Sequence, residues 1–135
     1  MKIAVAGIGY VGLSLATLLS DKNEVVAYDI VPEKVEMINN RISPIKDNEI
    51  DIFFKTKQLI LRATLDYEDA FKDAEYIIIC TPTDYDEEKG TFDISNVDDI
   101  IQKVIKMNLN TTMVVKSTVP VGFTLSMKKS MALII

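Results

Sequence analysis

The chain has 135 residues, of which 48% are hydrophobic, and its formal net charge is −5. That length is enough for one domain with a packed core, and the acidic balance argues against nucleic-acid binding. No apolar run approaches the ~20 residues of a membrane span, and the N-terminus lacks the apolar core of a signal peptide, so a cytoplasmic protein without a membrane partner is expected.

The first thirty residues have the order strand, glycine turn, helix, strand and acid. Residues 2–6 form an apolar, partly β-branched run, and the glycine turn GIGYVG at 7–12 follows at once. A helical pattern over 11–20 leads to a second apolar run, 25–28, which ends on Asp29. A dinucleotide-binding βαβ unit requires this order, which favours that function over a purely structural glycine turn.

Each part of this unit has its own expected role. Gly7 permits a sharp turn off the strand, Gly9 lets a pyrophosphate approach the backbone, and Gly12 lets the helix pack close to the strand. The unpaired N–H groups at the start of the helix, from about Val11, suit an anionic pyrophosphate. Asp29 would accept hydrogen bonds from ribose hydroxyls and repel a 2′-phosphate, so NAD is favoured over NADP as the cofactor.

Helices and strands are predicted to alternate along the rest of the chain. Helical patterns begin at Pro32 and at about 47, cover 66–71, begin again at Ser95 as the N-cap, and recur weakly over 123–129, whereas 59–64, 76–80 and 113–116 favour strands. Residues 81–90 are interpreted as a long acidic loop. With no linker or repeat in view, residues 1–135 are expected to form one α/β domain, a Rossmann-type doubly wound parallel sheet of strand order 3-2-1-4-5.

Ligands of open parallel sheets bind beyond the carboxyl ends of the strands, so residues that follow strands are the next candidates. Thr83 and Thr118 could hydrogen-bond near the nicotinamide half of a cofactor, and turn capping is an equally good interpretation of both. Lys34 could reach the adenosine ribose or a phosphate, although spacing alone slightly favours a solvated lysine. Tyr10 could cover the cofactor or pack at the surface.

Two other features have a plainer interpretation. Cys80, the only cysteine of a chain without histidine, ends a buried strand, where free cysteine usually acts as a small hydrophobe and not as a nucleophile. The acidic residues Asp84, Asp86, Glu87 and Glu88 are interpreted as a solvated loop, because nothing else converges there. No metal site is therefore expected.

Several segments together resemble the UDP-glucose 6-dehydrogenases, within the nucleotide-sugar dehydrogenases. The matching stretches are 1–7, 9–14, 24–29, 40–45, 63–66, 81–86 and 116–124. The last two, TPTDYD and KSTVPVGFT, are distinctive, and the likeness extends to about Lys129. The resemblance implies oxidation of the C6 hydroxymethyl group of UDP-glucose by two NAD, which gives UDP-glucuronate.

The resemblance also implies a role for each matching residue. Val11 and the glycine turn would hold the pyrophosphate, and Asp29, assisted by Lys34, would bind the adenosine ribose. Thr83 would contact the cofactor near the nicotinamide ribose. Thr118 would contact the cofactor and help to order the water used in catalysis.

The resemblance further implies what this chain would lack. The catalytic residues of the family would come after Ile135, so no catalytic residue is expected here, and the chain would be inactive by itself. Strand six would be missing or reduced to 133–135, and without the family's dimer helix the oligomeric state stays open. UDP-glucose would bind only to a full-length enzyme. Two alternatives also stay open: an NAD-binding module that docks on a partner, and the NAD domain of a GDP-mannose or UDP-aminosugar dehydrogenase.

Overall fold

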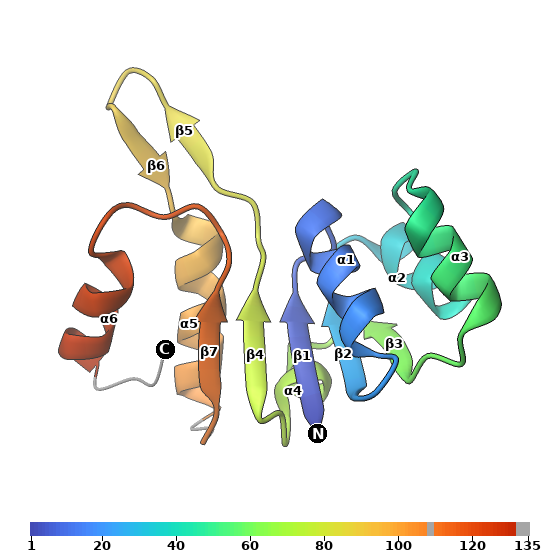
Figure 1. Cartoon of the computed structure of the whole chain (residues 1–135). Helices are drawn as coiled ribbons and strands as arrows, with labels where there is room; N and C mark the ends of the chain where they lie inside the picture. Colours follow the sequence, from blue (N-terminus) through green and yellow to red (C-terminus); the bar gives the residue numbers. More distant parts are fainter. Residues whose placement is uncertain (108–109, 132–135) are drawn as a thin grey trace.

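A five-stranded parallel sheet forms the centre of the computed structural model, which describes residues 1–107 and 110–131 (Figure 1). Its strands, in the order of the sheet, are β3 (Leu61–Thr64), β2 (Glu24–Tyr28), β1 (Lys2–Ala6), β4 (Tyr76–Ile79) and β7 (Thr112–Val115). All four pairings are parallel. The predicted doubly wound fold and its strand order 3-2-1-4-5 are confirmed, because β7 is the fifth strand of this sheet. The rudimentary strand six predicted at 133–135 lies outside the described residues.

Helices cover both faces of the sheet (Figure 1). They are α1 (Tyr10–Leu19), α2 (Pro32–Asn39), α3 (Asn48–Thr56), α4 (Tyr67–Phe71), α5 (Ser95–Lys106) and α6 (Phe123–Met131). Apolar residues of α1, α2 and α3 pack in one core cluster, and those of α4 and α5 pack in a second cluster. In the described part of the chain, no helix is long and apolar enough to cross a membrane.

The central strand β1 contributes to both cores. Ile3 and Val5 belong to the cluster on one face, and Ala4 and Ala6 belong to the cluster on the other. A strand buried on both faces has no polar side to show, so its sequence is a continuous apolar run. This is why 2–6 was recognisable as a strand from the sequence.

The prediction of a loop over 81–90 is wrong in part. Residues Asp84–Asp86 (β5) and Thr91–Asp93 (β6) form an antiparallel hairpin that extends beyond the main sheet (Figure 1). The rings of Tyr85 and Phe92 pack edge to face across it, with centroids 5.1 Å apart. Asp86 closes the turn by accepting hydrogen bonds from two backbone N–H groups. Strands of three residues carry too short an alternation to be distinguished from a loop.

The predicted N-cap of α5 is also wrong by one residue. Ile94 occupies the N-cap position, and Ser95 is the first helical residue. The backbone N–H of Ser95 donates to Asp93 Oδ1 over 3.0 Å. The carboxylate of Asp93 thus satisfies the backbone N–H of the first helical residue, which has no acceptor within the helix.

Arg41 ties the end of α2 to the edge strand β3. It has a left-handed backbone conformation, with φ of 58°. Its guanidinium donates to the carbonyls of Ile38, Leu59 and Leu61 over 2.7–3.1 Å. Three hydrogen bonds from one charged group hold the connection after α2 against the sheet.

Candidate functional site

The register of the sheet brings four turns to one edge. Ala6 lies opposite Tyr28 on one side and Ile79 on the other, and Ile79 lies opposite Val115. The four strands therefore end level with one another. The residues that follow them, which include Gly7, Asp29 and Cys80, are neighbours in space although they are far apart in the sequence.

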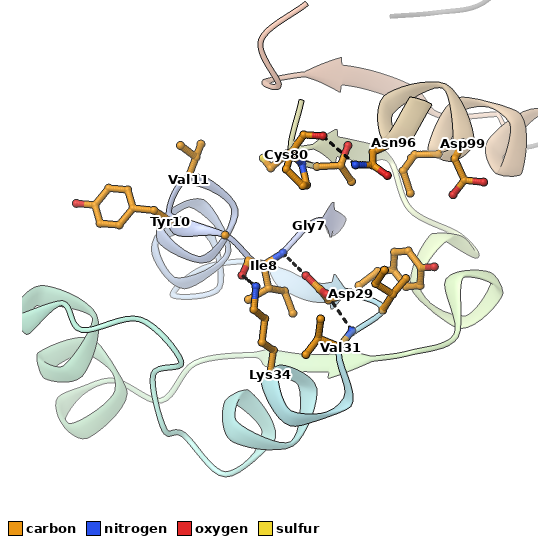
Figure 2. Close-up of a pocket in the computed structure, with 16 residues that line it drawn as sticks. Gly7, Ile8, Tyr10, Val11, Asp29, Val31, Lys34, Cys80, Asn96 and Asp99 are labelled. Carbon is orange, nitrogen blue, oxygen red and sulfur yellow. Dashed lines mark hydrogen bonds between the residues drawn. The ribbon is translucent and has the colours of Figure 1, made fainter. Parts of the chain in front are cut away.

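A pocket of about 520 Å³ opens at this edge between β1 and β4, where the order in which successive strands join the sheet reverses. Its lining comprises residues 7–11, residues 28–31 with Lys34, residues 80–82, and three residues of α5, namely Asn96, Asp99 and Ile100. In Figure 2, Asn96 and Asp99 lie across the pocket from Val31 and Lys34. The switch point of a doubly wound sheet is where such folds bind ligands.

Two glycines allow the first turn to be this tight. Gly7 has φ of +102°, and a Cβ there would lie 2.8 Å from the carbonyl carbon of Cys80. A Cβ on Gly12 would lie only 1.8 Å from the carbonyl oxygen of Gly7. Helix α1 therefore begins in direct contact with the turn, and neither position has space for a side chain.

The start of α1 faces the pocket without a competing charge. Gly9 is the N-cap and supplies no side-chain hydrogen bond, and the first turn of the helix contains no acidic residue. A Cβ on Gly9 would meet nothing within 4 Å among the described residues. The exposed residues Tyr10 and Val11 line the pocket beside it. Free N–H groups at a helix start, next to open space, suit a phosphate group.

Asp29 joins this turn to the end of β2. Its carboxylate accepts a hydrogen bond from the backbone N–H of Ile8 over 2.7 Å and one from Val31 over 3.0 Å. Lys34 Nζ donates to the carbonyl of Ile8 over 3.2 Å (Figure 2). An ionised carboxylate can accept about four hydrogen bonds. Asp29 is therefore oriented by the backbone and keeps acceptor capacity toward the pocket.

A second pocket of about 260 Å³ adjoins the first. It shares Val11 and residues 80–82 with the larger pocket, and it adds Thr83 and residues 116–118. Thr83 and Thr118, which follow different strands, thus line the same small cavity. The structure brings every residue of the sequence-based site to one of the two pockets, except Gly12, which packs beneath the turn.

Hydrogen bonds hold the segment between the two pockets. Ser117 Oγ donates to the carbonyl of Thr81 over 2.6 Å, and Asn96 Nδ2 donates to the carbonyl of Pro82 over 3.0 Å. The hydroxyl oxygen of Thr81 is buried without a hydrogen-bond partner in the described part of the chain. A buried hydroxyl at a pocket wall is a position where a ligand group can complete the hydrogen bonding.

Cys80 lines both pockets but is not activated. Burial raises the pKa of its thiol to about 11, and the charge of Lys116 offsets only part of this effect. The thiol is therefore protonated at neutral pH, which agrees with the interpretation of Cys80 as a small apolar residue.

Sequence reasoning missed the contribution of α5 to the site. Asn96 and Asp99 are three residues apart and so lie on one face of the helix, and both line the larger pocket. Neither residue is among the site candidates that the sequence suggested. A polar pair at this spacing, at the start of the helix after the switch-point strand, is the signal that could have identified them.

Comparison with known proteins gives a consistent result. Residues 1–133 match the NAD binding domain of the UDP-glucose/GDP-mannose dehydrogenase family. The chain is 51% identical over 124 residues to a UDP-glucose 6-dehydrogenase of Streptococcus pneumoniae, and the matched segment is 92% of this chain and 32% of that protein. It is 42% identical over 131 residues to a UDP-glucose 6-dehydrogenase of Campylobacter jejuni, and this match covers 96% of this chain and 33% of that protein.

A solved structure agrees with these matches. The UDP-D-ManNAc dehydrogenase of Pyrococcus horikoshii superposes with a TM-score of 0.84 at 30% identity, over 100% of this chain and 34% of that one. The chain thus spans about a third of the length of the relatives that it matches.

Proposed function

Since this chain belongs to the UDP-glucose/GDP-mannose dehydrogenase family and matches its NAD-binding domain, we propose that it holds NAD for the oxidation of UDP-glucose. The C6 hydroxymethyl group would be oxidised twice, with one water consumed and one hydride passed to each of two NAD, to give UDP-glucuronate. The identity of 51% to a UDP-glucose 6-dehydrogenase carries this choice. A UDP-aminosugar enzyme is less similar, at 30%, so that alternative has weaker support.

The residues of the larger pocket suit the adenosine and pyrophosphate parts of NAD. The pyrophosphate would lie on the N–H groups at the start of α1, in the open space beside Gly9. The adenosine ribose would donate its hydroxyl hydrogen bonds to Asp29, and Lys34 would add a positive charge nearby. Tyr10 would cover the cofactor from the exposed side.

The carboxylate of Asp29 would also make the site prefer NAD over NADP. A 2′-phosphate on the ribose would lie against the negative charge of Asp29, and the residues that follow it, Ile30 to Glu33, include no arginine to offset that charge. Lys34 is the cation that lines this pocket, and its ammonium already donates to a backbone carbonyl.

The smaller pocket would take the nicotinamide half, where bound NAD supplies the hydride acceptor. Thr83 would contact the nicotinamide ribose, and Thr118 would contact the cofactor and help to order the water that the second oxidation consumes. The unpartnered hydroxyl of Thr81 supports a polar ligand here. The 135 residues by themselves would bind NAD without turnover, because they span about a third of the length of the relatives whose names give the activity.

Calorimetric titration tests this proposal directly. The chain should bind NAD more tightly than NADP, and UDP-glucose should give no heat of binding. Asp29→Ala should weaken NAD binding at least tenfold, whereas Glu36→Ala removes the same charge from an exposed position of α2 and should not. A folded chain that binds no NAD would refute the proposed cofactor site. NADH formed from UDP-glucose by this chain alone would refute the predicted lack of turnover.

A further inference from the structure

The larger pocket continues past the residues assigned to ribose and pyrophosphate. In Figure 2, Tyr10 and Val11 lie on one side of the pocket, Asp29 lies in the middle, and Asp99 lies on the opposite side. A dinucleotide with its pyrophosphate on the glycine turn and its ribose at Asp29 must place its base beyond the ribose. The base would therefore lie between the turn after β2 and the face of α5.

The walls of this region suit a flat aromatic ring. Ile30 is 78% exposed, which is unusual for a large apolar side chain at a pocket. Ile100 and the ring of Tyr28, both buried, add apolar surface to the lining. Ligand pockets typically combine such apolar walls with a few polar groups that set orientation. A purine ring against Ile30 would remove its side chain from water.

Asp99 is the acidic group of α5 in this region. Its Oδ2 accepts a hydrogen bond from Lys103, one helical turn further along. The ammonium of Lys103 also lies 5.3 Å from the centroid of the Tyr67 ring. These contacts fix one oxygen of the carboxylate and leave Oδ1 as an acceptor. Asn96 is the other polar side chain of this face, and its side-chain amide donates to the backbone carbonyl of Pro82.

We propose that Asp99 selects adenine as the base of the bound dinucleotide, by accepting a hydrogen bond from the exocyclic N6 amino group. This inference rests on the proposed binding of NAD in the larger pocket. Adenine presents a hydrogen-bond donor at this position, whereas a 6-oxopurine such as hypoxanthine presents a carbonyl acceptor. Two acceptors would then face each other, so the carboxylate disfavours the 6-oxopurine as well as attracting adenine.

Titrations with NAD and with nicotinamide hypoxanthine dinucleotide test this selection. The unaltered chain should bind NAD about tenfold more tightly, which is the effect of one hydrogen bond to a charged group near the surface. The asparagine side chain of the Asp99→Asn variant can donate a hydrogen bond to the 6-carbonyl of hypoxanthine and can also accept one from the N6 amino group of adenine. It should weaken NAD binding by roughly three- to tenfold and bring the ratio of the two dissociation constants close to one.

Asp98→Asn is the matched control, because it makes the same change on the same helix at a residue that does not line the pocket. Its ratio of dissociation constants should equal that of the unaltered chain. If Asp99→Asn keeps the original ratio while NAD still binds, the role of Asp99 is refuted and the NAD site stands. If the unaltered, folded chain binds no NAD, both proposals fail. Circular dichroism of each variant verifies that loss of the exposed pair with Lys103 leaves the fold intact.

Discussion

Replacing Gly12 by alanine should strongly destabilise the chain, because the added methyl group has no room. The Cβ would lie 1.8 Å from the carbonyl oxygen of Gly7, whereas carbon and oxygen atoms normally approach no closer than about 3.3 Å. The start of α1 and the turn would have to separate by roughly 1.5 Å, which is the difference between these two distances.

Neither side of this contact can yield without breaking other contacts. The N–H of Gly7 donates to the carbonyl of Tyr28 over 2.8 Å, and the Cβ direction of Gly7 points at the backbone of Cys80. Overpacking of this kind typically costs 1–3 kcal/mol and occasionally more, whereas alanine in a helix gains about 0.5–1 kcal/mol over glycine. Because the contact of 1.8 Å is with backbone, the cost lies at or above the top of the first range, and we expect the free energy of unfolding to fall by about 2 kcal/mol or more.

Urea unfolding followed by circular dichroism measures this loss. Gly9→Ala is the matched control, because its φ of −90° suits alanine and its Cβ meets nothing within 4 Å among the described residues. That variant should keep its unfolding midpoint but lose NAD affinity at least tenfold, since the methyl group enters the pyrophosphate site. An unchanged midpoint for Gly12→Ala would refute the packing argument, and unchanged NAD affinity for Gly9→Ala would refute the placement of the pyrophosphate.

Three further predictions test other parts of the structure. Arg41→Met should lower the free energy of unfolding by about 2 kcal/mol in urea titrations, because three backbone carbonyls lose a charged donor; an unchanged midpoint would contradict that role. Cys80 should react slowly with iodoacetamide at pH 9, where a pKa of about 11 leaves roughly 1% as thiolate. Its rate should still be rising at pH 10, and a plateau near pH 9 would contradict the effect of burial. Lys34→Met should weaken NAD binding by roughly three- to tenfold and reduce its dependence on ionic strength; equal affinity at low salt would leave Lys34 as a solvated lysine.

Some features of the fold could be predicted because their signals are local. The apolar strands, the helix periodicity and the glycine turn each lie within about ten residues of sequence. The hairpin over 84–93 could not be predicted in the same way. Its strands are too short for a periodic signal, and the contact between its two rings joins residues on opposite sides of the turn at Asp86.

The amino-acid sequence by itself determined the glycine turn and the position of Asp29, because backbone conformation and strand burial constrain which residue types each position accepts. The order of the sheet was predictable from the alternation of strands and helices, which is typical of a doubly wound sheet. Only the tertiary structure decided which residues from other segments line the same pockets as these. The register of the parallel strands brings Thr83 and Thr118 into one cavity, and the way α5 packs on the sheet turns Asn96 and Asp99 toward the larger pocket. The spacing of Asn96 and Asp99 places them on one face of a helix, but contacts between segments far apart in the chain decide which pocket that face borders.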